Sequence, residues 1–287
     1  MASVNRELLV PYMEAYRSYL DAQERDDNVG PFSNVQEEYK RDIAKKAAAI
    51  IASDSWQESY IGSGLIGDQV IKAVQRNVNL VGRFQITAFS DKVKEDYSAS
   101  EQILYVLFHD HKGEDAFEAI CKIFGRKYDL VSYLYFVHDP NRYLPLRSSI
   151  FDDIFKKLGI DLRTSGRCSW NNYLEYLTTI AAVRDLMKDY YQVDDIDLLD
   201  AHSFLWTLNP DGVDLKPKEE SIANTNEDSI KEKKAEVGTA VFHKEYGKGT
   251  ISKITEENIY IEFGCGLRLF PYPDAIEKGW LTFELYQ

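Results

Sequence analysis

One segment near the C-terminus lacks the apolar side chains that a folded core requires. Between Asp214 and Glu236 the chain has no aromatic residue and only three large aliphatic ones, among many Lys, Glu, Asn and Ser. So little apolar surface cannot offset the entropy that is lost when a chain becomes ordered. We therefore predict a flexible charged linker over 214–236, which separates a domain at 1–213 from a domain at 237–287.

The last fifty residues predict a small β-barrel. Short β-rich runs follow one another and are divided by polar turns or by turns that contain glycine, which tolerates a positive φ. Four or five such strands bury their faces only by curling into a barrel, so we expect an SH3-like (Tudor-type) fold that the tail at 269–281 closes. The four clearest runs are Thr239–His243, Gly249–Ile254, Asn258–Phe263 and Leu267–Phe270.

A string of spaced residues at the start of this module resembles a known family. It reads V-G-x-x-V-x-H-x-x-Y-G-x-G-x-I from Val237 to Ile251. It is similar to the Tudor-like module at the C-terminus of UvrD-like DNA helicases, and to related barrels in bacterial transcription-associated proteins. The resemblance covers 237–263, and the tail departs from the helicase version. It implies a docking module for RNA polymerase or nucleic acid that has no catalytic activity.

Aromatic residues of this module are its candidate binding residues. We select His243, Tyr246, Tyr260 and Phe270, because an exposed aromatic pair can bind a partner. The alternative for the first two is that the turn geometry alone requires them. The alternation along the strands places some aromatic side chains in the core and others at the surface, and the sequence does not say which.

The first 213 residues predict a multi-helical domain, so the fold class is mainly α with a small C-terminal all-β barrel. Apolar positions recur three and four residues apart in most segments, whereas the glycine-rich stretch 54–67 predicts a loop and 78–89 a strand or extended segment. Asp129–Val137 is almost wholly apolar, and its helical neighbours favour a helix that is buried on all sides. The expected cap of the helix at 148–158 is Ser148 or Ser149, and that of the helix at 169–191 is Ser169. The other expected helices are 3–26, 34–52, 68–74, 100–108, 113–124, 148–158, 169–191 and 195–208.

Composition and charge limit the classes of function. The net charge is -13, and no domain has the basic footprint of a non-specific DNA-binding protein, so a nucleic-acid contact would need a local basic patch. A protein partner, or an acidic surface that mimics DNA, fits the bulk charge at least as well. The chain begins without a signal peptide and lacks an apolar stretch of about 20 residues, so we expect a cytoplasmic protein without membrane contact.

Metal and cofactor sites are not indicated. The three cysteines, Cys121, Cys168 and Cys265, have no CxxC spacing and form neither a disulfide framework nor a zinc site. His109 and His111 point apart if they are helical. The acids at 194–200 fit the start of a helix better than a Mg²⁺ site. We expect no cofactor and no metal, although the glycines at 62–67 can accept an anion.

A distinctive string in the helical domain resembles a second family. It is similar to a helical region of uncharacterised bacterial proteins of restriction and phage-defence type, where the region is often attached to a nuclease or an ATPase. The resemblance spans 55–208 and implies no particular activity. The residues that carry it lie at 56, 61–64, 133–136, 139–147, 151–152, 158–159, 169–173 and 199–206.

A third similarity is to helix-hairpin-helix DNA glycosylases, in which a turn proline is followed by the catalytic aspartate. Pro145 is followed here by Leu146 and Arg147, so the expected acid is absent, and the nearest carboxylate is Asp152. An enzyme that acts on DNA, either an atypical glycosylase or a metal-dependent nuclease, would therefore have to depart from the standard mechanism. Its candidate catalytic residues are Asp139, Asp152 and His202.

Three further residues are binding candidates in the helical domain. Arg142 and Arg147 bracket the Pro145 turn and can hold a phosphate, or else pair with the acids of the next helix. Trp170 either lines a pocket or packs as scaffold.

Our first hypothesis is a bacterial interaction protein, without enzymatic activity, that is associated with DNA transactions or phage defence. The helical domain would recognise a ligand, and the barrel would dock a protein or nucleic acid. The alternatives are the DNA-modifying enzyme described above and an acidic inhibitor that mimics DNA. The sequence leaves the oligomeric state open.

Overall fold

A computed structural model shows a mainly helical protein with a small C-terminal all-β unit, which confirms the predicted fold class. The chain divides into two compact units, Met1–Lys218 and Glu219–Gln287. The predicted linker lies outside the described residues except for Leu215, which is 8% exposed and belongs to the core of the helical unit. The structure describes residues 4–24, 29–77, 80–109, 113–209, 215, 237–243, 246–255, 258–264, 266–272, 275 and 280–283.

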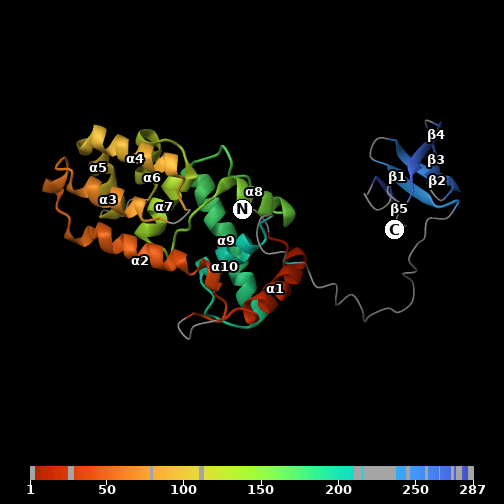
Figure 1. The fold of residues 1–287 in the computed structure, drawn as a ribbon, viewed down its shortest axis with the longest axis horizontal. Helices are drawn as coiled ribbons and strands as arrows, with labels where there is room; N and C mark the ends of the chain where they lie inside the picture. The colour runs from red at the N-terminus through yellow and green to blue at the C-terminus, as the bar shows by residue number, and fades with distance from the viewer. Residues whose placement is uncertain are drawn as a thin grey trace. The chain divides into compact units, whose positions relative to one another are not determined.

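The helical unit has two groups of helices around one hydrophobic core. Helices α3 to α6 gather at one end and α1, α8, α9 and α10 at the other, with α2 and α7 between them (Figure 1). The helices are α1 Arg6–Asp21, α2 Tyr39–Ile51, α3 Leu65–Gln75, α4 Arg83–Glu95, α5 Tyr97–Phe108, α6 Gly113–Phe124, α7 Tyr128–His138, α8 Ser148–Lys157, α9 Trp170–Tyr191 and α10 Leu198–Thr207. Short 3-10 helices are η1 Val35–Glu37, η2 Ser53–Ser55 and η3 Glu58–Tyr60.

Helix α7 is the centre of this core. Every residue from Leu130 to Val137 is buried, which confirms the helix expected from the apolar run. A buried polar group of α7 finds its partner on another helix: the Tyr133 hydroxyl donates to the carbonyl oxygen of Ala73 on α3 at 3.1 Å. A helix with no exposed face shows no periodic alternation of apolar and polar residues. The helix was therefore preferred to a strand only because its neighbours along the chain are helical.

The segment 78–89 was predicted as a strand or an extended stretch, and this prediction is wrong. Helix α4 begins at Arg83 and continues to Glu95. Its buried positions are Phe89, Ser90 and Val93, which are spaced as on one helix face. Only Phe89 of these three lies within 78–89, so that stretch did not contain the spacing of buried positions that marks the helix.

The helix caps agree with the sequence in part. The side chain of Ser169 accepts a hydrogen bond from the Asn172 N–H at the start of α9, as expected. For α8, however, the capping position is Arg147, one residue before the predicted serines, and it makes no side-chain cap hydrogen bond. The first turn of α8 therefore receives no cap from that side chain.

The β unit is a five-stranded antiparallel sheet with strand order β4-β3-β2-β1-β5. The expected runs are all strands, and the tail supplies β5, which pairs with β1. Gly249 is required in β2 because a Cβ there would lie 2.6 Å from side-chain atoms of both Ile261 and Phe263. The strands are β1 Ala240–His243, β2 Gly247–Ile254, β3 Asn258–Phe263, β4 Gly266–Pro271 and β5 Leu281–Phe283.

Candidate groove and adjoining cavity in the helical unit

The N-terminal ends of three helices meet at one groove. Its volume is about 670 Å³, and it is lined by residues 126–129 at the start of α7, 147–149 at the start of α8 and 165–169 before α9. Each helix N-terminus presents backbone N–H groups and the positive end of the helix dipole. We call this site the groove.

Cationic side chains dominate the lining of the groove. Four cations face a single carboxylate, Asp129, which lies 3.8 Å from the guanidinium of Arg147. Neither α8 nor α9 has an acid in its own first turn, although Glu118 accepts a backbone hydrogen bond from Trp170 at the start of α9. The four cations are Arg126, Lys127, Arg147 and Arg167.

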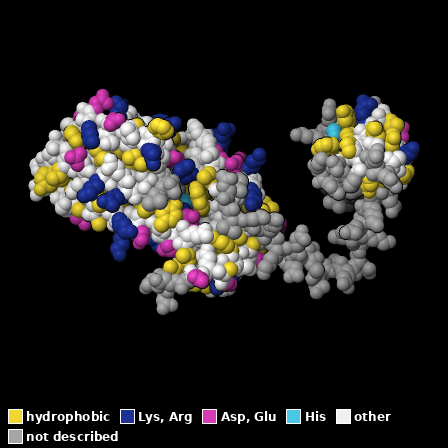
Figure 2. Space-filling model, in the orientation of Figure 1, with side chains coloured by type: hydrophobic (Ala, Val, Ile, Leu, Met, Phe, Trp, Pro, Cys, Tyr) yellow, Lys and Arg dark blue, Asp and Glu magenta, His cyan; other side chains and the backbone are white. Residues whose placement is uncertain are grey.

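Two of these cations have a structural partner and two do not. Arg126 donates to Glu118 at 2.7 Å and to the carbonyl oxygen of Cys168 at 2.9 Å. Lys127 and Arg167 are exposed, and neither forms an ion pair within the described part of the chain. On the face seen in Figure 2, cationic and acidic side chains are mixed. The groove is therefore a local concentration of positive charge on an acidic protein.

A pair of thiols stands at the edge of the groove. The Sγ atoms of Cys121 on α6 and Cys168 are 3.9 Å apart, although 47 residues separate them in the chain, and both thiols are free. The hydrogen bond with Cys168, helped by Arg126, lowers the pKa of the Cys121 thiol. No spacing of cysteines along the chain would have predicted this pair.

A second, smaller cavity adjoins the groove through Arg147, which lines both. Its volume is about 310 Å³, within the range of small-molecule pockets. The walls come from α2, from the Pro145 turn, from α8 and from α10. We call it the aromatic cavity, because Tyr39 and Trp206 form two of its walls.

The ammonium of Lys40 is the polar centre of the aromatic cavity. Lys40 is only 1% exposed, and its Nζ forms an ion pair with Glu37 and lies 3.4 Å from Nδ1 of His202. It also lies 5.0 Å from the centroid of the Trp206 ring. Burial lowers the pKa of Lys40, and the carboxylate of Glu37 partly offsets this effect.

His202 is held as a neutral ring in one tautomer. Its Nε2 lies 3.1 Å from the carbonyl oxygen of Pro145, which can only accept, so Nε2 carries the proton. Nδ1 is then the acceptor that faces Lys40. Burial, followed by the charge of Lys40, lowers the pKa of His202 well below its ordinary value. Both ring nitrogens are thus engaged within the protein.

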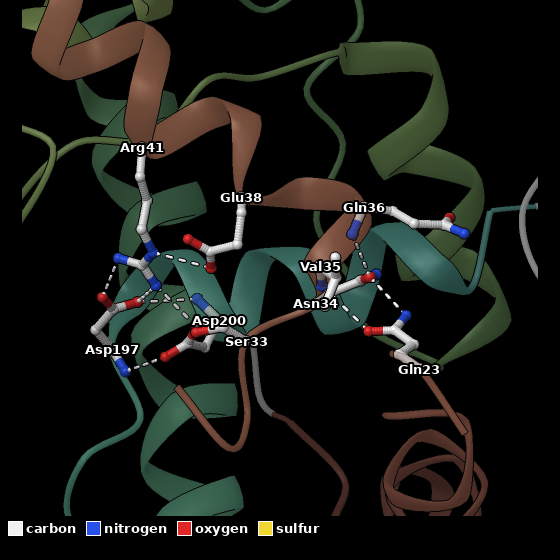
Figure 3. Close-up of polar contacts among 9 residues, drawn as sticks. All are labelled: Gln23, Ser33, Asn34, Val35, Gln36, Glu38, Arg41, Asp197 and Asp200. Carbon is white, nitrogen blue, oxygen red and sulfur yellow. Dashed lines mark hydrogen bonds and ion pairs between the residues drawn. The ribbon is translucent and has the colours of Figure 1, made fainter. Parts of the chain in front are cut away.

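A polar network joins the starts of α2 and α10 and so positions the cavity walls (Figure 3). Arg41 donates to Asp197 at 2.5 and 3.0 Å and to Asp200 at 2.8 Å, and Ser33 donates to Asp200 at 2.7 Å. Asp197 and Asp200 also form a capping box on α10. Burial and the charge of Asp197 raise the pKa of Asp200. The network fixes α2, with Lys40, against α10.

The three candidate catalytic residues lie in separate local structures. Asp139 accepts a hydrogen bond from the Asn141 N–H at 3.1 Å, just after α7. Asp152 on α8 accepts from the N–H groups of Thr164 and Ser165 at 2.6 and 3.0 Å and holds that loop. Burial opposes the ionisation of Asp152, but these hydrogen bonds outweigh it and lower the pKa. Within the described residues, no hydrogen bond or ion pair joins these two acids to each other or to His202.

The three binding candidates of the helical unit also lie in different local structures. Arg147 lines both the groove and the cavity, and its carboxylate partner is on α7 and not on the next helix. Arg142 lies over the ring of Tyr143, at 5.5 Å from its centroid. Trp170 packs among aromatic rings, including Phe117 at 5.6 Å between centroids. Arg142 and Trp170 line neither space.

In the β unit, the four aromatic candidates divide between core and surface. Phe270 is buried, and His243 stacks on Tyr246 with ring centroids 4.7 Å apart at the edge of the same core. Tyr260 lies on the other face of β3 from Ile259 and Ile261, which are buried. Tyr260 is therefore the candidate that belongs to the outer face of the sheet.

The glycine-rich loop before α3 already holds an anion from this chain. The carboxylate of Glu101 accepts hydrogen bonds from the N–H groups of Gly62, Gly64 and Gly67 at 2.6, 3.2 and 2.8 Å. Glu101 is 0% exposed. The expectation that an external anion can sit there is wrong, because an internal carboxylate occupies the N–H groups.

Neither of the metal alternatives gains support. Within the described residues, no group of three or more His, Cys, Asp and Glu side chains is close enough to hold a metal ion. His111 lies outside the described residues. Asp197 and Asp200, from the acidic run, cap α10 and bind Arg41.

Lys40, Trp206 and three cations of the groove were not among the site residues expected from the sequence. Lys40 lies in a run of charged residues that looks like a solvated helix face, and its burial depends on α10, whose His202 comes 162 residues later in the chain. Trp206 belonged to the distinctive string at 199–206, so that string was the available signal. Arg126, Lys127 and Arg167 come together only through the tertiary fold.

Comparisons of this chain with protein families, with curated proteins and with solved structures found no match. The site must therefore be interpreted from its own chemistry. Among the described helices, none has the length and the apolar character needed to span a membrane.

Proposed function

We propose that the helical unit binds the phosphate backbone of a nucleic acid in the groove, and that the protein is a bacterial one that takes part in DNA transactions or phage defence. The observation that carries this proposal is the convergence of three helix N-termini and four cationic side chains on one groove. Helix N-termini and guanidinium groups are the groups that proteins use to bind phosphate. A polymer of phosphates, and not a single carboxylate, fits the spread of cations from Arg126 to Arg167.

The net charge of -13 limits the mode of binding. An acidic surface repels a nucleic acid at long range, so affinity depends on the contacts inside the groove and not on a broad electrostatic footprint. The same cluster of cations favours this proposal over the DNA-mimic alternative, which needs a continuous acidic face. The enzyme alternative has weaker support, because the candidate catalytic residues are dispersed.

The experiment uses Lys127 and Arg167, the two groove cations that form no ion pair with a described residue. The double variant Lys127→Ala and Arg167→Ala should bind a fluorescein-labelled single-stranded oligonucleotide at least about tenfold more weakly in 50 mM salt than the wild type, because each lost cation removes a charge-assisted contact. The matched control is Lys46→Ala with Lys92→Ala. Both lysines are exposed, and each forms an ion pair on its own helix, Lys46 with Asp42 on α2 and Lys92 with Glu95 on α4. Equal losses in both double variants would refute the groove as the binding site.

The β unit supports a second function, the docking of a protein partner. Leu267 and Leu269 on β4 are 55% and 54% exposed, and Leu269 pairs in register with Tyr260 on β3. Hydrophobic side chains are visible on the face of the β unit in Figure 2. Exposed apolar side chains that cluster on one sheet face mark interaction sites.

The docking proposal is tested in two ways. Deletion of 219–287, which keeps Leu215 in the core of the helical unit, should abolish capture of the partner and leave the helical unit folded. In the full chain, Leu267→Ser with Leu269→Ser should do the same, whereas Lys94→Ser, at an exposed position of α4, should not. Unchanged capture by both altered proteins would contradict the proposal.

A further inference from the structure

We propose that the aromatic cavity binds the base of a nucleotide whose phosphate lies in the adjoining groove. This inference rests on the proposed function and adds a substrate class to it. Arg147 lines both spaces, so a phosphate beside its guanidinium would have its attached base within reach of the cavity. The cavity volume of about 310 Å³ is sufficient for one flat heterocycle.

The walls of the cavity suit a flat aromatic ligand. Tyr39 and Trp206 are both half-buried, and Leu80, Pro145 and Ile150 complete an apolar lining. Nucleobases stack on such aromatic side chains without regard to their sequence. Burial raises the pKa of Tyr39 to about 12, so its hydroxyl remains a donor at neutral pH.

Lys40 requires a hydrogen-bond acceptor on one edge of the ligand. An ammonium group has three N–H donors, and two of them are directed to Glu37 and to Nδ1 of His202. These are the polar partners of Lys40 among the described residues, so its third donor is available to an acceptor in the cavity. A buried donor that lacks an acceptor is costly. A base with a carbonyl oxygen on its edge, such as thymine, supplies this acceptor.

Arg147 and Lys40 therefore have different tasks. The exposed side of Arg147 belongs to the groove, where Lys127 and Arg167 provide further contacts to phosphate. Lys40 is reached only through the cavity, because it is almost completely buried. A ligand that has phosphates but no base can use the groove alone.

The test compares two oligomers of equal length with the full-chain protein. One is oligothymidine, and the other is an abasic deoxyribose-phosphate oligomer. The wild type should bind oligothymidine about tenfold more tightly, which corresponds to the contribution of one stacked base. Trp206→Ala, and independently Ile150→Trp, which fills the cavity, should bring this ratio close to one without changing the affinity for the abasic oligomer.

The outcomes separate the two proposals. Binding of both oligomers by the wild type with equal affinity would overturn the base site and leave the groove in place. Failure to bind either oligomer would overturn both. A third arm identifies the source of the nucleotide: if thymidine monophosphate displaces oligothymidine from the wild type but not from Ile150→Trp, the ligand is a free nucleotide, and if only the polymer binds, it is a strand.

Discussion

The ammonium of Lys40 lies 3.4 Å from Nδ1 of His202, in a contact that is buried between α2 and α10. The two residues are 162 positions apart in the chain, and the network around Arg41 holds their helices together. A protonated lysine and a neutral histidine are compatible in this arrangement, whereas two cations are not. This contact makes the helical unit sensitive to acid.

The first prediction concerns that sensitivity. Burial holds the pKa of His202 well below its ordinary value of 6.5, so below that pH the unfolded chain takes up a proton that the folded chain does not. The free energy of unfolding should therefore fall as the pH drops from about 6.5 toward the lowered pKa, by up to about 1.4 kcal/mol per pH unit from this residue. Urea unfolding of the wild type and His202→Gln between pH 5 and 8 measures it.

The comparison between the two proteins isolates the histidine. At pH 8 the difference in stability reports the packing and hydrogen bonds that the substitution removes. Below pH 6.5 the curve of His202→Gln should be flatter than that of the wild type. Parallel curves over the whole range would show that His202 does not titrate in this way.

A second prediction concerns Glu101. Glu101→Ala removes the acceptor of three N–H groups, of which those of Gly64 and Gly67 are buried, whereas Gly62 is an exposed residue. Each unsatisfied buried donor costs about 1 kcal/mol or more, so the variant should lose roughly 2 kcal/mol of stability. The control is Gln102→Ala, an exposed position on the same helix, which should stay within about 0.5 kcal/mol of the wild type. Similar losses in the two variants would argue against the capping role.

Helical periodicity and caps predicted most of the helical unit. The start of α9 at Ser169 and the buried α7 followed from local sequence, because a cap and an unbroken apolar run are local features. Helix α4 was missed because its buried residues extend beyond the stretch that suggested a strand. A helix was therefore predicted correctly where its sequence signal lay within the segment considered, and was missed where the signal extended beyond it.

The candidate site could not be predicted in the same way as the helices, because it is assembled from segments that are far apart in the chain. The groove needs 126–129, 147–149 and 165–169 to meet, and the cavity needs α2 to pack beside α10. Arg147 and His202 were selected from their local motifs. Lys40 was not selected, since nothing in its neighbourhood in the chain indicates that it is buried.

A third prediction tests the core of the β unit. In Gly249→Ala, the new Cβ would lie 2.6 Å from side-chain atoms of Ile261 and Phe263, so the strands must shift. We expect a loss of about 1–3 kcal/mol, seen as faster hydrogen exchange in the peptides of β2 and β3. Gly264→Ala is the matched control, because a Cβ there meets nothing within 4 Å. Unchanged exchange in Gly249→Ala would contradict the packing of β2 on β3.

The most direct test of the central claim is the salt dependence of oligonucleotide binding. Four groove cations that contact phosphates predict a slope of about −2.8 for the logarithm of the binding constant against the logarithm of the salt concentration on a single strand. Lys127→Ala with Arg167→Ala should reduce the magnitude of this slope by about 1.4, whereas Lys46→Ala with Lys92→Ala should leave it unchanged. If the wild-type slope is close to zero, or if the groove variant keeps the full slope, the groove does not bind phosphate and the account is wrong.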